Sequence, residues 1–284
     1  MNKLLASLLL FCCSNSLYAQ YYYKDIISNK QISADMASYK QKKIHSIKIK
    51  SFEDDGSASE GFLCEKTISR DYSNIELFTR SNVSAISLFT SVFNDKLQLL
   101  TTTDSSEISV TRNYYSYDET GRLKKILSSV KSNDDDFTNE IVEEHIYEYR
   151  GAGNPISMAR VKDRRDTTRV LFSLDEKNNV VLEKDSKSGT KYYYYYDEKN
   201  RITDIAHTNE FREKMVADYI FEYDDAGMLN QMTVTEEGRG KESQDNSQTF
   251  VTWRYINEGG LRQKEGLFTQ NGKLLGSIEY EYKR

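Results

Sequence analysis

Cysteine, proline and histidine are all scarce in this chain, and each scarcity excludes something. Among 284 residues there are three cysteines, one proline and three histidines. Cys12 and Cys13 lie in an apolar N-terminal segment, so a chain without that segment keeps only Cys64. Because one cysteine cannot form an internal disulfide, the fold depends on packing and backbone hydrogen bonds. We expect Cys64, between Leu63 and Glu65, to be a small buried apolar side chain.

The residue types that usually carry enzyme chemistry form no recognisable set. His45, His145 and His207 lack the spacing of a metal site, and the chain has no Cys-x-x-Cys pair. Residues 56–61 lack the spacing of a Gly-x-Ser-x-Gly nucleophile turn, and residues 238–241 lack that of a phosphate-binding loop. We therefore predict that the protein is not an enzyme and has no catalytic residues, no cofactor and no metal site.

Two groups of acidic residues could provide a metal site or a catalytic pair. Asp134–Asp136 could hold calcium, which binds several oxygen ligands on a tight loop, but Asn139 stands where an EF-hand needs glycine. The alternative is a solvated hairpin tip whose charges oppose edge-to-edge aggregation, and whether this loop binds calcium stays open. Carboxylates also recur at turns, and a pair of them could act as in a glycoside hydrolase. Their repetition at one structural position favours a role in the turns.

Clustered positive charge is also missing. Without Lys3 the chain has 38 basic and 44 acidic residues, a net charge of −6. Binding to a phosphate backbone depends on clustered lysine and arginine, so we predict no nucleic-acid partner.

The N-terminus has the pattern of an export signal. A basic start at Lys3 precedes an apolar run over residues 4–11, and Ala19 is a small residue suited to the position before a cut. The run is shorter than the roughly 20 residues that span a bilayer. We predict cleavage after Ala19, a mature chain from Gln20 without a transmembrane span, and a periplasmic, surface or secreted location. The alternatives are an uncleaved anchor and a lipid anchor on Cys12 or Cys13.

A repeated phrase dominates what is present. An aromatic or apolar residue is followed four positions later by glycine or asparagine, and two positions further usually by an apolar residue. The leading residues are Tyr117, Tyr149, Leu174, Tyr196, Tyr223, Tyr255 and Phe268, and the predicted turn residues are Gly121, Gly153, Asn178, Asn200, Gly227, Gly259 and Gly272. Glycine and asparagine most readily adopt positive φ. The pattern predicts an all-β fold: an elongated, twisted antiparallel sheet of repeated hairpins.

The sequence leaves open which face of the sheet the apolar residues after each turn occupy. Tyr115 and Tyr117 alternate on one face before the turn, as a half-buried strand requires. After the turn, the apolar sixth and ninth positions of the phrase, such as Leu123 and Ile126, differ in parity. Either a β-bulge shifts the phase of the strand, or both faces carry apolar residues.

The first part of the chain is less regular. We interpret residues 20–110 as an N-terminal cap with degenerate β-repeats, and residues 111–284 as the repeat array after a signal peptide over residues 1–19. A short helix is predicted over residues 33–43, with Ser33 as its cap.

The run from Tyr192 to Tyr196 is the candidate recognition surface. On a strand, Tyr193 and Tyr195 share the face opposite to Tyr192, Tyr194 and Tyr196. If one face packs inside the protein, the other exposes aromatic rings suited to stacking on sugars or docking a protein. The alternative is a strand buried on both faces.

The phrase Tyr117-Asp118-Glu119-Thr120-Gly121-Arg122-Leu123 resembles the YD repeat of the RHS family of bacterial surface proteins. The last copy, residues 268–274, is equally similar to the hairpin repeat of MORN-type proteins. RHS proteins wind many repeats into a shell around a toxic C-terminal domain, and this chain has too few repeats for a shell and no such domain after Arg284. The resemblance implies a repeat sheet and an envelope location.

We therefore expect an exported, non-enzymatic binding or scaffold protein whose partner is an envelope protein or polysaccharide. The alternatives are a carbohydrate-binding module using Tyr193 and Tyr195 and, more remotely, a glycoside hydrolase.

Overall fold

The structure, a computed structural model, describes residues 20–82, 86–134, 136, 139–209, 212–236 and 249–284. The predicted signal peptide lies outside these residues. Contacts divide the chain into two compact units. The first comprises Met1–Ile49, Glu60–Ser188 and Glu281–Arg284, and the second comprises Lys50–Ser59 and Gly189–Tyr280.

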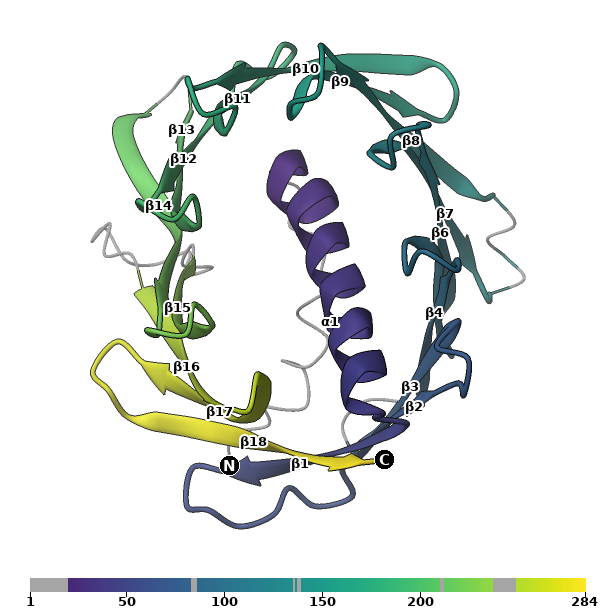
Figure 1. Cartoon of the computed structure of the whole chain (residues 1–284), viewed down its shortest axis with the longest axis vertical. Helices are drawn as coiled ribbons and strands as arrows, with labels where there is room; N and C mark the ends of the chain where they lie inside the picture. Colours follow the sequence, from purple (N-terminus) through teal and green to yellow (C-terminus); the bar gives the residue numbers. More distant parts are fainter. Residues whose placement is uncertain (1–19, 83–85, 135, 137–138, 210–211, 237–248) are drawn as a thin grey trace. The chain divides into compact units, whose positions relative to one another are not determined.

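The first unit contains an antiparallel series of strands in which each pairs with the next along the chain (Figure 1). These strands are β2 (Leu63–Ile68), β3 (Asn74–Arg80), β4 (Ser87–Phe93), β5 (Leu99–Ser106), β6 (Ser109–Tyr117), β7 (Leu123–Ser132), β8 (Ile141–Tyr149), β9 (Pro155–Lys162), β10 (Asp166–Leu174) and β11 (Val180–Asp185). The predicted boundary at residue 110 falls inside β6.

The second unit continues the same pattern. Its strands are β12 (Lys191–Tyr196), β13 (Ile202–Asn209), β14 (Arg212–Tyr223), β15 (Leu229–Glu236), β16 (Thr249–Glu258), β17 (Leu261–Thr269) and most of β18 (Leu274–Lys283). The prediction of an all-β repeat of hairpins with one N-terminal helix is confirmed.

The first and last strands are neighbours, which corrects the prediction of an open, elongated sheet. β1 (Ser46–Glu53) pairs with both β2 and β18. Within the first unit, the backbone N–H of His45 donates to the carbonyl of Lys283 at 2.9 Å. An unpaired edge would leave a row of N–H and C=O groups without partners, and this pairing satisfies them.

The turns share one pair of backbone hydrogen bonds. At the first copy the N–H of Asp118 donates to the carbonyl of Arg122, and the N–H of Gly121 donates to the carbonyl of Asp118, both at 2.9 Å. The same pair occurs at Asp175, Asp197, Asp224 and Thr269. The residue four positions after the leading residue has a positive φ in these five turns, at Gly121, Asn178, Asn200, Gly227 and Gly272.

Two of the seven predicted copies differ in their turns. In the turn after Tyr149, φ is positive at Gly151 (65°) and not at Gly153. β16 continues past Tyr255 to Glu258, which pairs directly with Leu261. Gly259 and Gly260, at φ 57° and 73°, therefore form a two-residue hairpin turn of the primed type, which needs positive φ at both positions.

A β-bulge beside the leading residue resolves the question of parity. Ser116 pairs with Lys125, whereas Tyr117 pairs with Leu123, so one extra residue lies in the second strand. The same register shift adjoins Tyr149, Leu174, Tyr196, Tyr223 and Phe268. The bulge brings the sixth and ninth positions of the phrase to one face, and Leu123 and Ile126 are accordingly both buried.

The sequence predicts a strand pair over residues 86–100 around Asn94, which is confirmed, but its turn was not recognised as a further copy of the phrase. Between β4 and β5 the side chain of Asn94 accepts hydrogen bonds from the N–H groups of Lys96 and Gln98, as Asp118 does from Thr120 and Arg122. Leu97 occupies the fourth position with φ 58°. The copy was hidden because a leucine replaces the glycine or asparagine by which the others were found.

The N-terminal helix is longer than predicted. A π-helical segment, η2 (Tyr22–Ile27), continues into α1 (Ser28–Lys42), so Ser33 lies within the helix and does not cap it. Tyr21, Tyr22 and Ile26 are buried. The Tyr21 ring contacts His145 on β8 and the Tyr22 ring contacts Phe172 on β10, and these distant contacts stabilise the added N-terminal part of the helix. It therefore packs on a face of the first unit (Figure 1).

Candidate functional site

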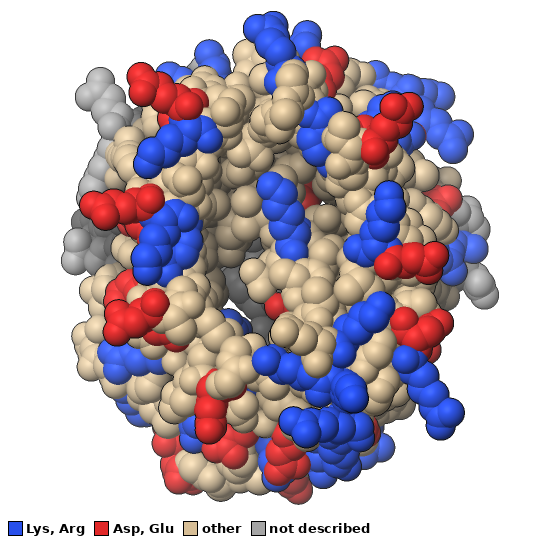
Figure 2. Space-filling view, viewed as in Figure 1, with Lys and Arg blue, Asp and Glu red and all other residues tan. Residues whose placement is uncertain are grey.

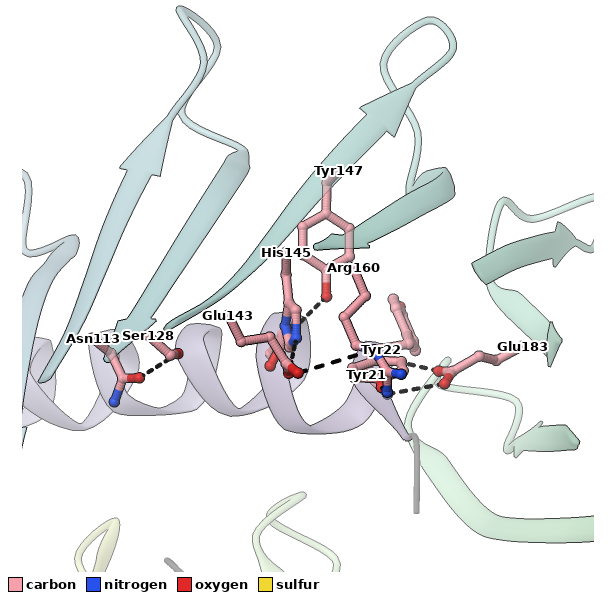
Figure 3. Close-up of polar contacts among 10 residues, drawn as sticks. Tyr21, Tyr22, Asn113, Ser128, Glu143, His145, Tyr147, Arg160 and Glu183 are labelled. Atoms are coloured by element: carbon pink, nitrogen blue, oxygen red, sulfur yellow. Dashed lines mark hydrogen bonds and ion pairs between the residues drawn. The ribbon is translucent and has the colours of Figure 1, made fainter. Parts of the chain in front are cut away.

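The helix η2–α1 crosses the strands of the first unit, and polar contacts mark its course. The N–H groups of Tyr21 and Tyr22 bind Glu183 on β11, and the Asp25 carboxylate binds side chains on β8. Further along, the amide of Asn29 bonds the Tyr117 hydroxyl on β6 at 3.0 Å. We call the residues around Asp25 and Glu183 the docking cluster. It comprises Asp25, Glu143, His145, Tyr147, Arg160, Glu183 and the N-terminal pair Tyr21 and Tyr22, and Figure 3 labels all of these except Asp25.

The imidazole of His145 lies between two carboxylates. Its Nδ1 is 2.5 Å from Oδ2 of Asp25 on the helix, and its Nε2 is 2.9 Å from Oε1 of Glu143 on the same strand. The hydroxyl of Tyr147 donates to the same Asp25 oxygen at 2.7 Å. Both ring nitrogens therefore face acceptors, an arrangement that only the protonated imidazolium satisfies at both positions.

The local charges change the pKa values in the cluster. Burial lowers the pKa of His145, but the charges of Asp25 and Glu143 and their hydrogen bonds raise it by more, to about 9. The hydrogen bond from His145 holds the pKa of Glu143 below its usual range. His145 is therefore a cation at neutral pH and links the helix to β8.

Arg160 on β9 holds the first aromatic ring of the helix. Its guanidinium donates to the Tyr21 hydroxyl at 2.5 Å and lies 5.9 Å from the centre of that ring. Burial raises the pKa of Tyr21 to about 12, although Arg160 opposes the shift. The Tyr21 ring also meets the His145 ring edge-on at 4.9 Å, so the two cations contact the same tyrosine.

Glu183 lies at a repeat position that is apolar in four of the seven copies. It stands nine positions after the leading residue Leu174, where the other copies have Ile126, Met158, Ile205, Met232, Lys264 and Ser277, the first three of them buried apolar side chains. Glu183 is itself fully buried, and its two oxygens accept from Tyr21 and Tyr22 at 3.0 and 2.9 Å (Figure 3). A carboxylate in this position satisfies the N–H groups that open the helix.

The docking cluster was missed in the sequence, although two signals were visible. One is His145, whose partner Asp25 lies 120 positions away in the chain, so that the sequence alone predicts only a packed or solvated imidazole. The other is Glu183, at a position that is apolar in four of the seven copies. An acidic residue where most copies have an apolar one is the signal that points to such a site.

Chemically, these side chains bind and position the helix. Among the described residues, no group of three or more His, Cys, Asp and Glu is arranged to hold a metal ion. Cys64 is fully buried as predicted, and burial raises the pKa of its thiol. Of the acidic loop Asp134–Asp136, Asp135 lies outside the described residues, as do Phe137 and Thr138 beyond it.

The tyrosine run lies on β12 in the second unit. Tyr192 and Tyr194 are buried, Tyr193 is half-buried and Tyr195 is 45% exposed, so the alternative of a strand buried on both faces is wrong. Tyr195 pairs with Asp204, which pairs with Ile220, so the three share a face. The Tyr195 hydroxyl lies 3.4 Å from the sulfur of Met215. We call Tyr193, Tyr195, Met215 and Ile220 the Tyr195 surface.

The turn carboxylates serve the turns. Asp118 accepts from the backbone N–H and the guanidinium of Arg122, which hold its pKa below the usual range. Asp197 and Arg201 repeat this arrangement. A glycosidase acid needs a raised pKa, so these two carboxylates do not fit that role.

Charges of both signs are distributed over the surface. Figure 2 shows lysine and arginine side chains lying among acidic ones over most of the face that it presents. Of the helices in the part of the chain that the structure describes, none combines the length and apolar character needed to cross a membrane.

Comparisons with known proteins give no family. No protein-family model matches the chain, and no curated protein matches it. Among solved structures, the chain is similar to TcdB2-TccC3 without its hypervariable C-terminal region, at 15% identity and a TM-score of 0.33. That match covers 78% of this chain and 12% of the other, so the chain spans about an eighth of that protein's length.

Two porin-like proteins are matched over nearly their full length. The one from Bacteroides uniformis has 10% identity and a TM-score of 0.40, and the one from Bacteroides vulgatus has 11% and 0.32. Each match covers 84% of this chain and 98% of the other. At these scores we draw no functional argument from the similarities, and the resemblance to YD and MORN repeats stays a prediction.

Proposed function

We propose that the protein is an exported, non-enzymatic binding or scaffold protein of a bacterial cell envelope. The observation that carries this proposal is the Tyr195 surface. Tyr195, Met215 and Ile220 are 45%, 44% and 38% exposed. The Tyr195 hydroxyl contacts Met215, and Ile220 lies on the same face two strands away, beyond Asp204. Exposed apolar groups that form a continuous patch are typical of interaction sites, and tyrosine and methionine are enriched there.

The export half of the proposal rests on the N-terminal sequence. The basic start, the short apolar run and Ala19 form the pattern that secretory signals share. The partner class that we propose is an envelope protein.

A carbohydrate partner is the second candidate, and one observation favours it. Asp204 lies directly opposite Tyr195 in the strand pairing, so a carboxylate stands beside an exposed aromatic ring. Such a ring can stack on the apolar face of a sugar while the neighbouring carboxylate accepts from sugar hydroxyls.

The test is capture of envelope proteins and polysaccharides on the immobilised chain from Gln20 to Arg284, compared with the variants Tyr195→Ala and Ile220→Ala. We expect one partner whose retention falls about tenfold or more in both variants, as for residues central to an interface. Leu171→Ala is the matched control, because Leu171 is equally exposed but lies on β10. Equal loss in all three variants, or retention by all of them, would contradict a site at the Tyr195 surface. If the two variants lose retention of a purified polysaccharide and of no protein, the partner is a carbohydrate.

A further inference from the structure

The start of the helix has an unusual environment. The Gln20 carbonyl accepts from the N–H of Lys24 at 2.9 Å, so Gln20 begins the helical hydrogen bonding. Gln20 is only 5% exposed, and the next two N–H groups point at the fully buried carboxylate of Glu183 (Figure 3). The backbone nitrogen of Gln20 is therefore one residue away from a nitrogen that already binds Glu183.

The surroundings carry negative charge at this point. Asp185 lies two residues beyond Glu183 on β11 and is also buried, and successive side chains at this spacing share a face. Arg160 and His145 both contact the Tyr21 ring. The Tyr21 hydroxyl, Glu143 and the charge of Asp185 engage Arg160, and two carboxylates engage His145. A positive charge on the Gln20 nitrogen would lie one residue from the first of the two N–H groups that bind Glu183.

We propose that Glu183 is the receptor for the α-ammonium group created when the chain is cut after Ala19, and that this ion pair locks η2–α1 onto the first unit. The inference rests on the export proposed above. In the cleavage, water adds to the Ala19 carbonyl carbon and the Ala19–Gln20 bond breaks. Ala19 leaves as a carboxylate and Gln20 keeps an amine, which takes up a proton. The peptidase is that of the exporting cell.

The repeat supports this role for Glu183. An apolar side chain fills the equivalent position in four of the other six copies, and a buried carboxylate is costly unless hydrogen bonds or a cation compensate it. Charged hydrogen bonds are about twice as strong as neutral ones, so a cation beside the two N–H groups adds substantially to what they provide.

A thermodynamic cycle tests the lock. One chain begins at Gln20, released from a fusion partner, and a second keeps Ala19, which turns the Gln20 amine into an amide. Both are made with Glu183 and with Glu183→Gln, and their unfolding constants are measured in denaturant. We expect Ala19 to raise the unfolding constant about tenfold in the native background and less than about twofold in Glu183→Gln. Equal effects in both backgrounds would overturn the proposal.

The matched control is Glu265→Gln, which changes a buried glutamate in the second unit. It is expected to leave the tenfold effect of Ala19 unchanged, and loss of that effect would contradict the role of Glu183. If Glu183→Gln does not fold, acylation of the α-amine in the native chain from Gln20 replaces the cycle. We expect acylation to be at least about tenfold slower in the folded chain than in denaturant, since the amine is buried. Equal acylation rates in the folded and the denatured chain would overturn the proposal. So would a chain mass lower by one ammonia, because that loss shows that Gln20 has cyclised to an uncharged lactam.

Export is tested separately, by expressing residues 1–284 in an exporting bacterium and sequencing the N-terminus of the product. A product beginning at Gln20 supports both proposals. An uncut precursor overturns the export and the role of cleavage, whereas a failed cycle overturns only Glu183 as receptor.

Discussion

The hydroxyl group of Tyr149 donates a 2.6 Å hydrogen bond to the backbone carbonyl of Leu123 in the preceding copy of the repeat. Tyr223 makes the same bond to Ile202 at 2.7 Å. In both cases the arginine of the preceding copy stacks on the tyrosine ring, with Arg122 and Arg201 each 4.3 Å from the ring centre. The leading tyrosine therefore joins consecutive copies.

The first prediction concerns this bond. Tyr149→Phe and Tyr223→Phe should each lower the free energy of unfolding by about 1 kcal/mol, because each removes one donor to a carbonyl and keeps the ring. The measurement is equilibrium denaturation, with Tyr114→Phe at an exposed position as control. Clearly unequal losses at 149 and 223 would show that the two contacts are not equivalent.

The second prediction concerns the pH dependence that His145 confers. Its folded pKa of about 9 lies above the unfolded value of 6.5, so its stabilisation is complete below pH 6.5 and is lost as the pH rises through 9. The loss should reach about 3 kcal/mol. Asp25, Glu143, Tyr147, Arg160 and Tyr21 are the polar groups that face the imidazole from the packed elements.

Unfolding in urea at a series of pH values measures this effect. His145→Gln is the control, because glutamine does not titrate, and its stability should change much less between pH 6.5 and 9. If the free energy of unfolding of the unsubstituted protein does not change across this pH range, the assignment of a charged His145 is wrong.

The third prediction concerns the turns. Gly121→Ala should cost about 1 kcal/mol or more, because φ is +86° there and the new Cβ meets the Gln98 amide nitrogen at 3.1 Å. Gly153→Ala should cost less, since φ at Gly153 is not positive and only the Asn178 side chain must give way. Thermal melting of both variants checks this, and an equal loss at the two glycines contradicts it.

The fourth prediction concerns helix packing. Met36 on α1 is fully buried, so Met36→Ala should cost about 2 to 5 kcal/mol. The same substitution at Met215, which is largely exposed, should cost far less. Denaturation monitored by near-UV circular dichroism compares the two, and a small loss at Met36 would mean that the helix contributes little to stability.

Several features of the fold were predictable because they depend on nearby residues. Asp118 and Gly121 determine their turn through hydrogen bonds within five residues and a φ that glycine favours. The copy at Leu97 was missed for the same reason, since a side chain that tolerates positive φ poorly gives no local signal there. Likewise, the different parity of Leu123 and Ile126 indicated that a β-bulge was one of two possibilities, but only the strand pairing showed that the bulge exists.

The candidate site was much less predictable. Tyr193 and Tyr195 could be proposed from alternation along one strand, but their exposure depends on what packs against each face of the sheet. The helix partners of His145 and Glu183 lie 120 or more positions earlier in the chain, so no local pattern connects them.

The sequence by itself determined the repeat, the antiparallel hairpins and most of their turns, because these follow from alternation, Asx hydrogen bonds and backbone φ within a few residues. Only the tertiary structure decided where the helix begins, that the first strand pairs with the last, and why Glu183 is buried. These depend on contacts between distant residues, whose free energy appears only when the strands have assembled beside the N-terminal segment.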